Sequence, residues 1–204
     1  TVQSANELAV QIRSGALPTS LTIVEERTVG ASLGKDSIEA GEWAAVIGTA
    51  AVSGFMIFAY GLFGIFALIA VALNLFLIVG VMSTLGSTLT LPGIAGLVLT
   101  VGMAVDANVL IYERIREELR NGKTSISAIE SGFSRAFTTI LDSNLTTLIA
   151  GLVMFWLGAG PVRGFAVTLS LGIFATVFTA FTVTRLLVSI WIARQKSKKI
   201  PAPL

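Results

Sequence analysis

The sequence predicts an all-α integral membrane protein, and three observations lead to this prediction. Of its 204 residues, 54% are hydrophobic and only 13% are charged, and the mean hydropathy is +0.85; soluble domains do not have this composition. Five apolar segments approach or exceed the roughly 20 residues that a helix needs to cross a bilayer. The third segment contains a single carboxylate, Asp106. We expect five transmembrane helices, preceded by a short extracytoplasmic α/β segment.

The five apolar segments form a predicted transmembrane domain over residues 43–192. Aromatic residues lie near the proposed ends, as is usual at membrane interfaces. The first two segments are separated only by the Gly61–Gly64 region, which predicts a tight helical hairpin. The segments are Trp43–Leu62, Phe63–Leu85, Leu91–Tyr112, Ile140–Gly158 and Gly164–Ile192.

Basic residues orient these helices. One cluster lies in the connection 113–139 and the other in the tail 193–204. Successive crossings place both clusters on one side, which the positive-inside rule makes cytoplasmic. The segment 1–42 and the connections Gly86–Thr90 and Ala159–Arg163 then face outward. This predicts a multi-pass membrane protein with an extracytoplasmic N-terminal segment and a cytoplasmic tail.

Residues 1–42 have the pattern expected for the end of an extracytoplasmic domain. Ser4 and Glu7 have capping-box spacing and predict a helix to about Ser14. The β-favouring run Leu21–Val24 predicts a strand, and Asp36 predicts the cap of a short helix before the first span. With no signal sequence at its start, the chain is expected to be a piece that lacks an upstream membrane anchor.

The connection 113–139 contains a second helical pattern. After a break at Asn121-Gly122, apolar residues recur at Ile126, Ile129, Phe133 and Phe137. This spacing favours an amphipathic helix in the plane of the lipid headgroups. The alternative is a helix that packs under the bundle as ordinary core.

Asp106 is the main candidate functional residue. It lies six residues before Tyr112, about 9 Å inside the membrane interface, which is too deep for an aspartate to reach the headgroups. Low dielectric favours the neutral form of a carboxyl group, so a carboxylate here can load and release a proton. Gly102, one turn away, would let a partner or water approach, whereas Asn108 is about 200° round the helix and should face a different neighbour. The alternative role for Asp106 is a polar packing contact.

The other polar residues of the predicted spans receive supporting roles. Asp142 is expected to be an N-cap or interfacial group, and Asn144 is expected to hydrogen-bond between helices together with Thr146 and Thr147. Asn74 lies mid-span and needs a partner. Arg185 is favoured as an interfacial anchor over a partner for Asp106. We therefore expect the cation that complements Asp106 to come from another subunit.

Several function classes are excluded by residue types. The chain has no Cys and no His, which excludes disulfides, thiol nucleophiles, zinc sites built on His, and Ser-His-Asp triads. Intramembrane aspartyl proteases need two facing carboxylates, one of them in a Gly-x-Gly-Asp sequence, and this context differs. The phosphate-binding Gly-x-x-x-x-Gly-Lys-Ser/Thr loop is absent from the sequence. We expect no enzyme, no cofactor other than protons as the coupling ion, and no nucleic-acid partner.

Four segments resemble the SecD/SecF family of protein-translocase accessory subunits, within the RND superfamily. The longest begins with Leu-Pro-Gly-Ile-Ala-Gly and continues through Val-Gly-Met-Ala-Val-Asp-Ala-Asn around Asp106 to Tyr-Glu-Arg-Ile-Arg-Glu-Glu. The resemblance covers all five predicted spans. The four segments are Leu91–Glu118, Gly158–Val167, Asn74–Leu77 and Asp142–Thr146.

The resemblance implies a C-terminal membrane portion and a mechanism. It implies five of six spans, a pseudo-two-fold bundle completed by SecF, and association with the SecYEG channel and YajC. It also implies that Asp106 is the proton-relay carboxylate of a machine that uses the protonmotive force to complete export of preproteins. The charged groups that complement it in SecF are not in this chain.

Three functions remain open at this point. The leading one is a proton-driven accessory subunit of protein export, in contact with SecF, the channel, exported preproteins and membrane lipids. The second is half of a proton-coupled exporter of small molecules or lipids of the RND type. The third is a scaffold without proton flux, which predicts that a neutral residue is tolerated at position 106.

Overall fold

The structure, a computed structural model, describes residues 2–13, 31–87 and 89–194. The chain divides into two units, Thr1–Gly34 and Lys35–Leu204. The described part of the first unit contains helix α1 (Val2–Arg13), which confirms a helix in this segment. The helix begins before Ser4, so the capping box predicted at Ser4 is wrong. The predicted strand at 21–24 and the basic residues of the tail from 195 onward lie outside the described residues.

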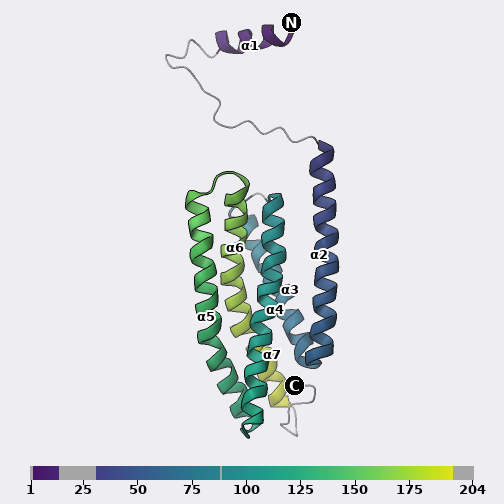
Figure 1. Cartoon of the computed structure of the whole chain (residues 1–204), viewed down its shortest axis with the longest axis vertical. Coiled ribbons are helices and arrows are strands. Elements are labelled where there is room, and N and C mark those ends of the chain that lie inside the picture. The colour runs from purple at the N-terminus through teal and green to yellow at the C-terminus, as the bar shows by residue number, and fades with distance from the viewer. Residues whose placement is uncertain (1, 14–30, 88, 195–204) are drawn as a thin grey trace. The chain divides into compact units, whose positions relative to one another are not determined.

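The second unit consists of helices over its described residues, and five helical segments are long and apolar enough to cross a membrane (Figure 1). This confirms the predicted fold class. The fifth crossing, Pro161–Arg194, is built from three successive pieces, one of them a π-helix. The elements are α2 (Ala31–Tyr60), α3 (Leu62–Thr84), α4 (Leu91–Arg120), α5 (Ser125–Leu157), α6 (Pro161–Phe178), η1 (Thr179–Thr184) and α7 (Arg185–Arg194).

Local sequence explains where these helices begin. Thr90 caps α4, because its Oγ1 accepts a hydrogen bond from the Gly93 N–H at 3.2 Å. Thr124 caps α5 in the same way, accepting from the Ser127 N–H at 3.5 Å. Gly61 has a φ of 54° between α2 and α3, a conformation that glycine adopts without strain. The tight helical hairpin predicted around Gly61 is therefore confirmed.

Helix α5 corrects the prediction for the connection 113–139. It runs without a break for 33 residues, about 50 Å, so it extends beyond a bilayer core of about 30 Å. Its first half packs against the extended end of α4, where a Cβ atom at Gly132 would lie 2.9 Å from the Ile115 nitrogen. Ile129 and Phe133 are buried in the core. The prediction of a helix in the headgroup plane is therefore wrong, and the alternative prediction of a helix packed under the bundle is confirmed.

Helix α2 also differs from its prediction, because Asp36 lies within one continuous helix and does not cap a separate one. Only 11% of the membrane window of α2 is buried. Its last turns hold it to the bundle through Met56 and Tyr60, both buried. Val52, one turn earlier, also packs against the core, whereas most of the membrane window before it is exposed.

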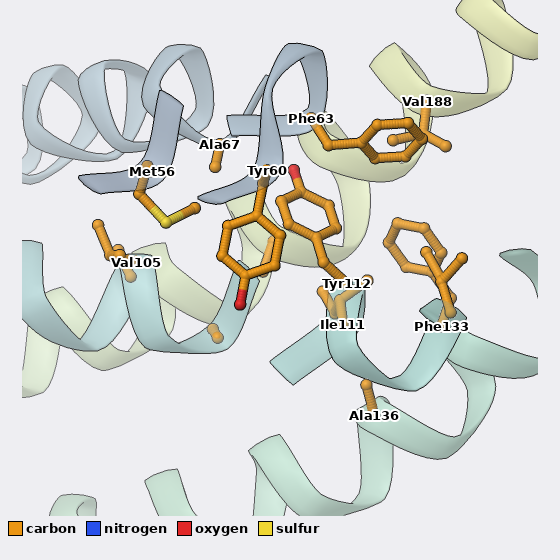
Figure 2. Packing of buried hydrophobic residues seen from close by; sticks show 14 of the residues in the cluster. Met56, Tyr60, Phe63, Ala67, Val105, Ile111, Tyr112, Phe133, Ala136 and Val188 are labelled. Carbon is orange, nitrogen blue, oxygen red and sulfur yellow. The ribbon is translucent and has the colours of Figure 1, made fainter. Parts of the chain in front are cut away.

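The aromatic core joins all the crossings at one end of the bundle (Figure 2). The Phe63 ring lies 5.4 Å from the Tyr112 ring and 5.5 Å from the Trp191 ring, measured between centroids. We call this end, which carries Glu113 to Arg135, the charged end. Close packing here fixes the register of α4 against α3, α5 and α7, and so positions the polar residues deeper in the membrane.

Candidate functional site: a polar layer within the membrane

Asp106 lies on an open face of α4. Its side chain is exposed and forms no hydrogen bond or ion pair with any residue that the structure describes. Leu99 on the same face is 47% exposed, and a Cβ atom at Gly102 would meet no heavy atom within 4 Å. We call Leu99, Gly102 and Asp106 the Asp106 face. The described helices supply no partner for this carboxylate.

Asn108 faces the opposite side of α4, as the helical angle predicted. It is buried, and its Nδ2 donates a hydrogen bond to the Ala104 carbonyl at 2.8 Å. Its Oδ1 accepts a hydrogen bond from the Thr184 hydroxyl at 2.7 Å. Because Thr184 is the last residue of η1, this bond ties the helix that carries Asp106 to a π-helical segment.

Asn74 holds the other end of that segment. Its Nδ2 donates to the Thr176 hydroxyl at 2.9 Å and to the Thr179 hydroxyl at 3.5 Å, which confirms that Asn74 needed a partner. Thr179 is the first residue of η1. Two buried asparagines therefore bracket the π-helix, an element that occurs frequently at functional sites. No feature of the sequence analysis predicted this π-helix.

Packing registers place these groups at one depth. Helices α4 and α6 both start at the same end of the bundle (Figure 1), and a Cβ atom at Gly172 would overlap the Thr100 side chain. Residues four further along, Thr176 and Ala104, are therefore also level. Since Asn74 bonds to Thr176, it lies near the depth of Asp106.

Asp142 belongs to the same layer, which corrects its predicted position. Helix α5 runs antiparallel to α4 with Gly132 against Ile115, so Asp142, ten residues beyond Gly132, lies level with Val105. Thr124 is the N-cap of this helix, and Asp142 lies in mid-helix with an exposed side chain. The predicted N-cap role is therefore wrong. We call Asn74, Asp106, Asn108 and Asp142 the polar layer.

The prediction that Asn144, Thr146 and Thr147 hydrogen-bond to other helices is wrong among the described residues. The Asn144 Nδ2 donates to the Ile140 carbonyl at 2.8 Å, and the hydroxyls of Thr146 and Thr147 donate to carbonyls four residues earlier, at 3.2 Å each. Such bonds within one helix satisfy a polar side chain without a neighbour. Asn144 therefore does not link α5 to another described helix.

Arg185, the first residue of α7, is not joined to Asp106. Its side chain is exposed and forms no ion pair with a described residue. It lines a groove between α5 and α7 together with Glu130. It directly follows Thr184, whose hydroxyl bonds Asn108, and its role as an interfacial anchor stays a prediction.

Ion pairs at the charged end were missed by sequence reasoning, which used these residues only to orient the helices. Glu118 is 1% exposed and pairs with Lys123 at 2.7 Å and Arg135 at 3.0 Å, joining α4, the turn and α5. The Tyr60 hydroxyl donates to Glu113 Oε1 at 2.9 Å. These contacts fix the α4–α5 hairpin and the end of α2 beneath the polar layer.

The Asn108–Thr184 bond yields a stability prediction. Thr184→Val keeps the side-chain shape and leaves the buried Asn108 Oδ1 without its donor, so we expect a loss of about 1 kcal/mol in unfolding free energy. Thermal and denaturant unfolding of the purified full-length protein in detergent would measure it. Thr146→Val, at an exposed position on α5, is the matched control and should change stability little. An equal loss in both variants would contradict a specific role for the bond.

The fold and the polar layer define the class of this protein: a multi-pass α-helical membrane protein with an acidic group on an open face inside the membrane. Residues 11–194 match the family described as "Protein export membrane protein SecD/SecF, C-terminal". The chain belongs to this SecD/SecF family, and it is a multi-pass protein of the bacterial inner membrane.

Similar proteins extend well beyond this chain. A "Protein translocase subunit SecD" from Rickettsia bellii (strain RML369-C) is 54% identical over 200 residues, which is 98% of this chain and 39% of that protein. A "Protein translocase subunit SecDF" from Brucella abortus biovar 1 (strain 9-941) is 50% identical, over 98% of this chain and 26% of that protein. The chain therefore spans about two fifths or less of the relatives named here.

A solved structure shows the same arrangement of helices. The "Crystal structure of SecDF in Super-membrane-facing form" matches with a TM-score of 0.79 and 44% sequence identity. The match covers 100% of this chain and 28% of that one. Together with the SecD relatives, this similarity indicates that the chain corresponds to a membrane portion of a SecD-type protein.

Proposed function

We propose that this chain is the membrane portion of a Sec translocase accessory subunit that uses the protonmotive force, with Asp106 as its proton-relay carboxylate. One observation carries the proposal: Asp106 is exposed at membrane depth and has no partner among the described residues. A lone carboxylate facing lipid costs several kcal/mol when charged, so such groups face a partner or an aqueous path.

The partner that covers the Asp106 face is proposed to be a SecF-type set of spans. The Brucella relative bears the name SecDF, and the family resemblance implies a second, homologous bundle with the complementary charges. Gly102 leaves room for close approach of another helix. In this assignment the SecYEG channel, YajC and exported preproteins are the further partners, and the charged end is cytoplasmic.

The mechanism follows from the change in charge at Asp106. Protonation removes a charge from the face between the two bundles, which changes the helix packing that is most stable. The bond from Asn108 to Thr184 carries a movement of α4 to the π-helix. Asp142, at the same depth on the neighbouring helix, is a second group that a proton could reach. Protons are the proposed coupling ion, with no other cofactor.

The proposed function is tested by the response of export to a proton gradient. Membrane vesicles depleted of the full-length protein, and the same vesicles with it restored, would be compared for completion of preprotein translocation with and without an imposed gradient. We expect the gradient to accelerate completion only where the protein is present. If restoring the protein accelerates translocation equally with and without the gradient, the scaffold function is established instead. If restoring the protein does not change the translocation rate, a role in translocation is contradicted.

A further inference from the structure

A groove between α5 and α7 at the charged end is separate from the Asp106 face. Its volume is about 500 Å³. Apolar side chains form most of its wall, and one residue of each charge faces it. The lining residues are Ile126, Ile129, Glu130, Arg185, Ser189, Ile192 and Ala193.

Aromatic rings lie next to the groove on its membrane side. The Phe181 ring lies 4.8 Å from the Phe137 ring and 6.5 Å from the Phe133 ring, between centroids. Phe181 precedes Arg185 by about one turn, and Phe133 and Phe137 continue the helical stripe of Glu130. Phe137 is 43% exposed. An apolar surface therefore continues from the groove toward the bilayer interior.

The two charged residues of the groove form no ion pair among the described residues. Glu130 and Arg185 are exposed, and neither forms an ion pair with a described residue. By contrast, Glu113, Glu117 and Glu118 on α4 each pair with a nearby cation. The groove thus presents a free carboxylate and a free guanidinium along one apolar wall.

The groove lies at the depth of the lipid headgroups. Arg185 follows Thr184, whose hydroxyl bonds Asn108, so Arg185 lies about one turn on the membrane side of Tyr112. Gly132 packs against Ile115, and Glu130 lies two residues before Gly132 on a helix antiparallel to α4. Glu130 is therefore farther from the membrane interior than Tyr112. The two charges lie on either side of the level where the apolar run of α4 ends, which is where phosphate and amine groups of lipids are found.

We propose that this groove binds the headgroup of a zwitterionic aminophospholipid, phosphatidylethanolamine. The phosphate accepts hydrogen bonds from the Arg185 guanidinium, and the ammonium donates to the Glu130 carboxylate. The acyl chains lie along the apolar surface at Phe137. An anionic lipid fits less well, because its headgroup has no ammonium to pair with Glu130 and brings a net negative charge close to that carboxylate.

The test is lipid retention by the purified full-length protein. The protein would be equilibrated with an equal mixture of phosphatidylethanolamine and phosphatidylglycerol in mild detergent, and the bound lipids counted by native mass spectrometry. We expect the wild type to retain phosphatidylethanolamine. Arg185→Gln and Glu130→Gln should each reduce that retention about tenfold, the effect of losing one charge-assisted bond. Glu130→Gln should also raise retention of phosphatidylglycerol.

Charge substitutions outside the groove provide the controls. Arg194→Gln lies at the end of α7 and Glu117→Gln on α4, and neither residue lines the groove. Both should retain lipid like the wild type. A preference of the wild type for phosphatidylglycerol, or retention that neither groove substitution changes, would overturn the proposal. The readout is independent of export, so it stands or fails separately from the proposed function.

Discussion

Asp106→Asn in the full-length protein is expected to remove the acceleration of export by the proton gradient while membrane insertion and partner association stay intact. The amide keeps the size and polarity of the side chain and cannot exchange a proton. One elementary charge moving across 100 mV supplies about 2.3 kcal/mol, which corresponds to a shift of about fortyfold between two conformations. Without the carboxylate this bias is lost. Pulse-chase export in depleted cells, with and without a protonophore, would measure it.

Glu117→Gln is the matched control for this experiment. Glu117 is an exposed carboxylate on the same helix, beyond the apolar run, and pairs with Arg114 at 2.7 Å. Its neutralisation should leave gradient-driven export unchanged. Asp142→Asn tests the second carboxylate of the polar layer, and we expect a partial loss. Normal gradient-driven export with Asp106→Asn would show that Asp106 is a packing residue and that the relay lies elsewhere.

Much of the membrane fold could be predicted from sequence because bilayer thickness sets the length of a span and hydropathy reveals it. The turn at Gly61 and the start of α4 at Leu91 were predictable from local residue types. The continuity of α5 was not, because an amphipathic stripe looks the same whether it faces headgroups or another helix. Only contact between Gly132 and Ile115 decides between them.

The candidate site could also be predicted in part, from hydropathy and helical geometry. A lone carboxylate in an apolar run identifies Asp106, and helical angle placed Asn108 on another side. The polar layer could not be predicted, because the depth of Asp142 depends on how far α5 extends past the membrane. Likewise, nothing local to Thr179–Thr184 indicates a π-helix, whose bonds to Asn74 and Asn108 join residues far apart in the sequence.

Gly132→Leu and Gly102→Leu are expected to separate the packing of this chain from its association with a partner. A Cβ atom at Gly132 would lie 2.9 Å from the backbone nitrogen of Ile115 and 3.0 Å from its Cα. Backbone atoms cannot move aside as a side-chain tip can, so α4 and α5 must separate within the core. We expect a loss of about 3 kcal/mol in unfolding free energy, seen as a lower Tm of the full-length protein in detergent.

The same substitution at Gly102 should leave the Tm of the full-length protein unchanged, because a Cβ atom there meets nothing within 4 Å. If a second bundle packs on the Asp106 face, however, the leucine occupies space that the partner needs, and co-purification of the SecF-type partner should fall. Gly80→Leu, another glycine with open space but on α3, should change neither quantity. Normal partner association with Gly102→Leu would contradict the placement of the partner, because the open face of α4 would then be a lipid-facing surface.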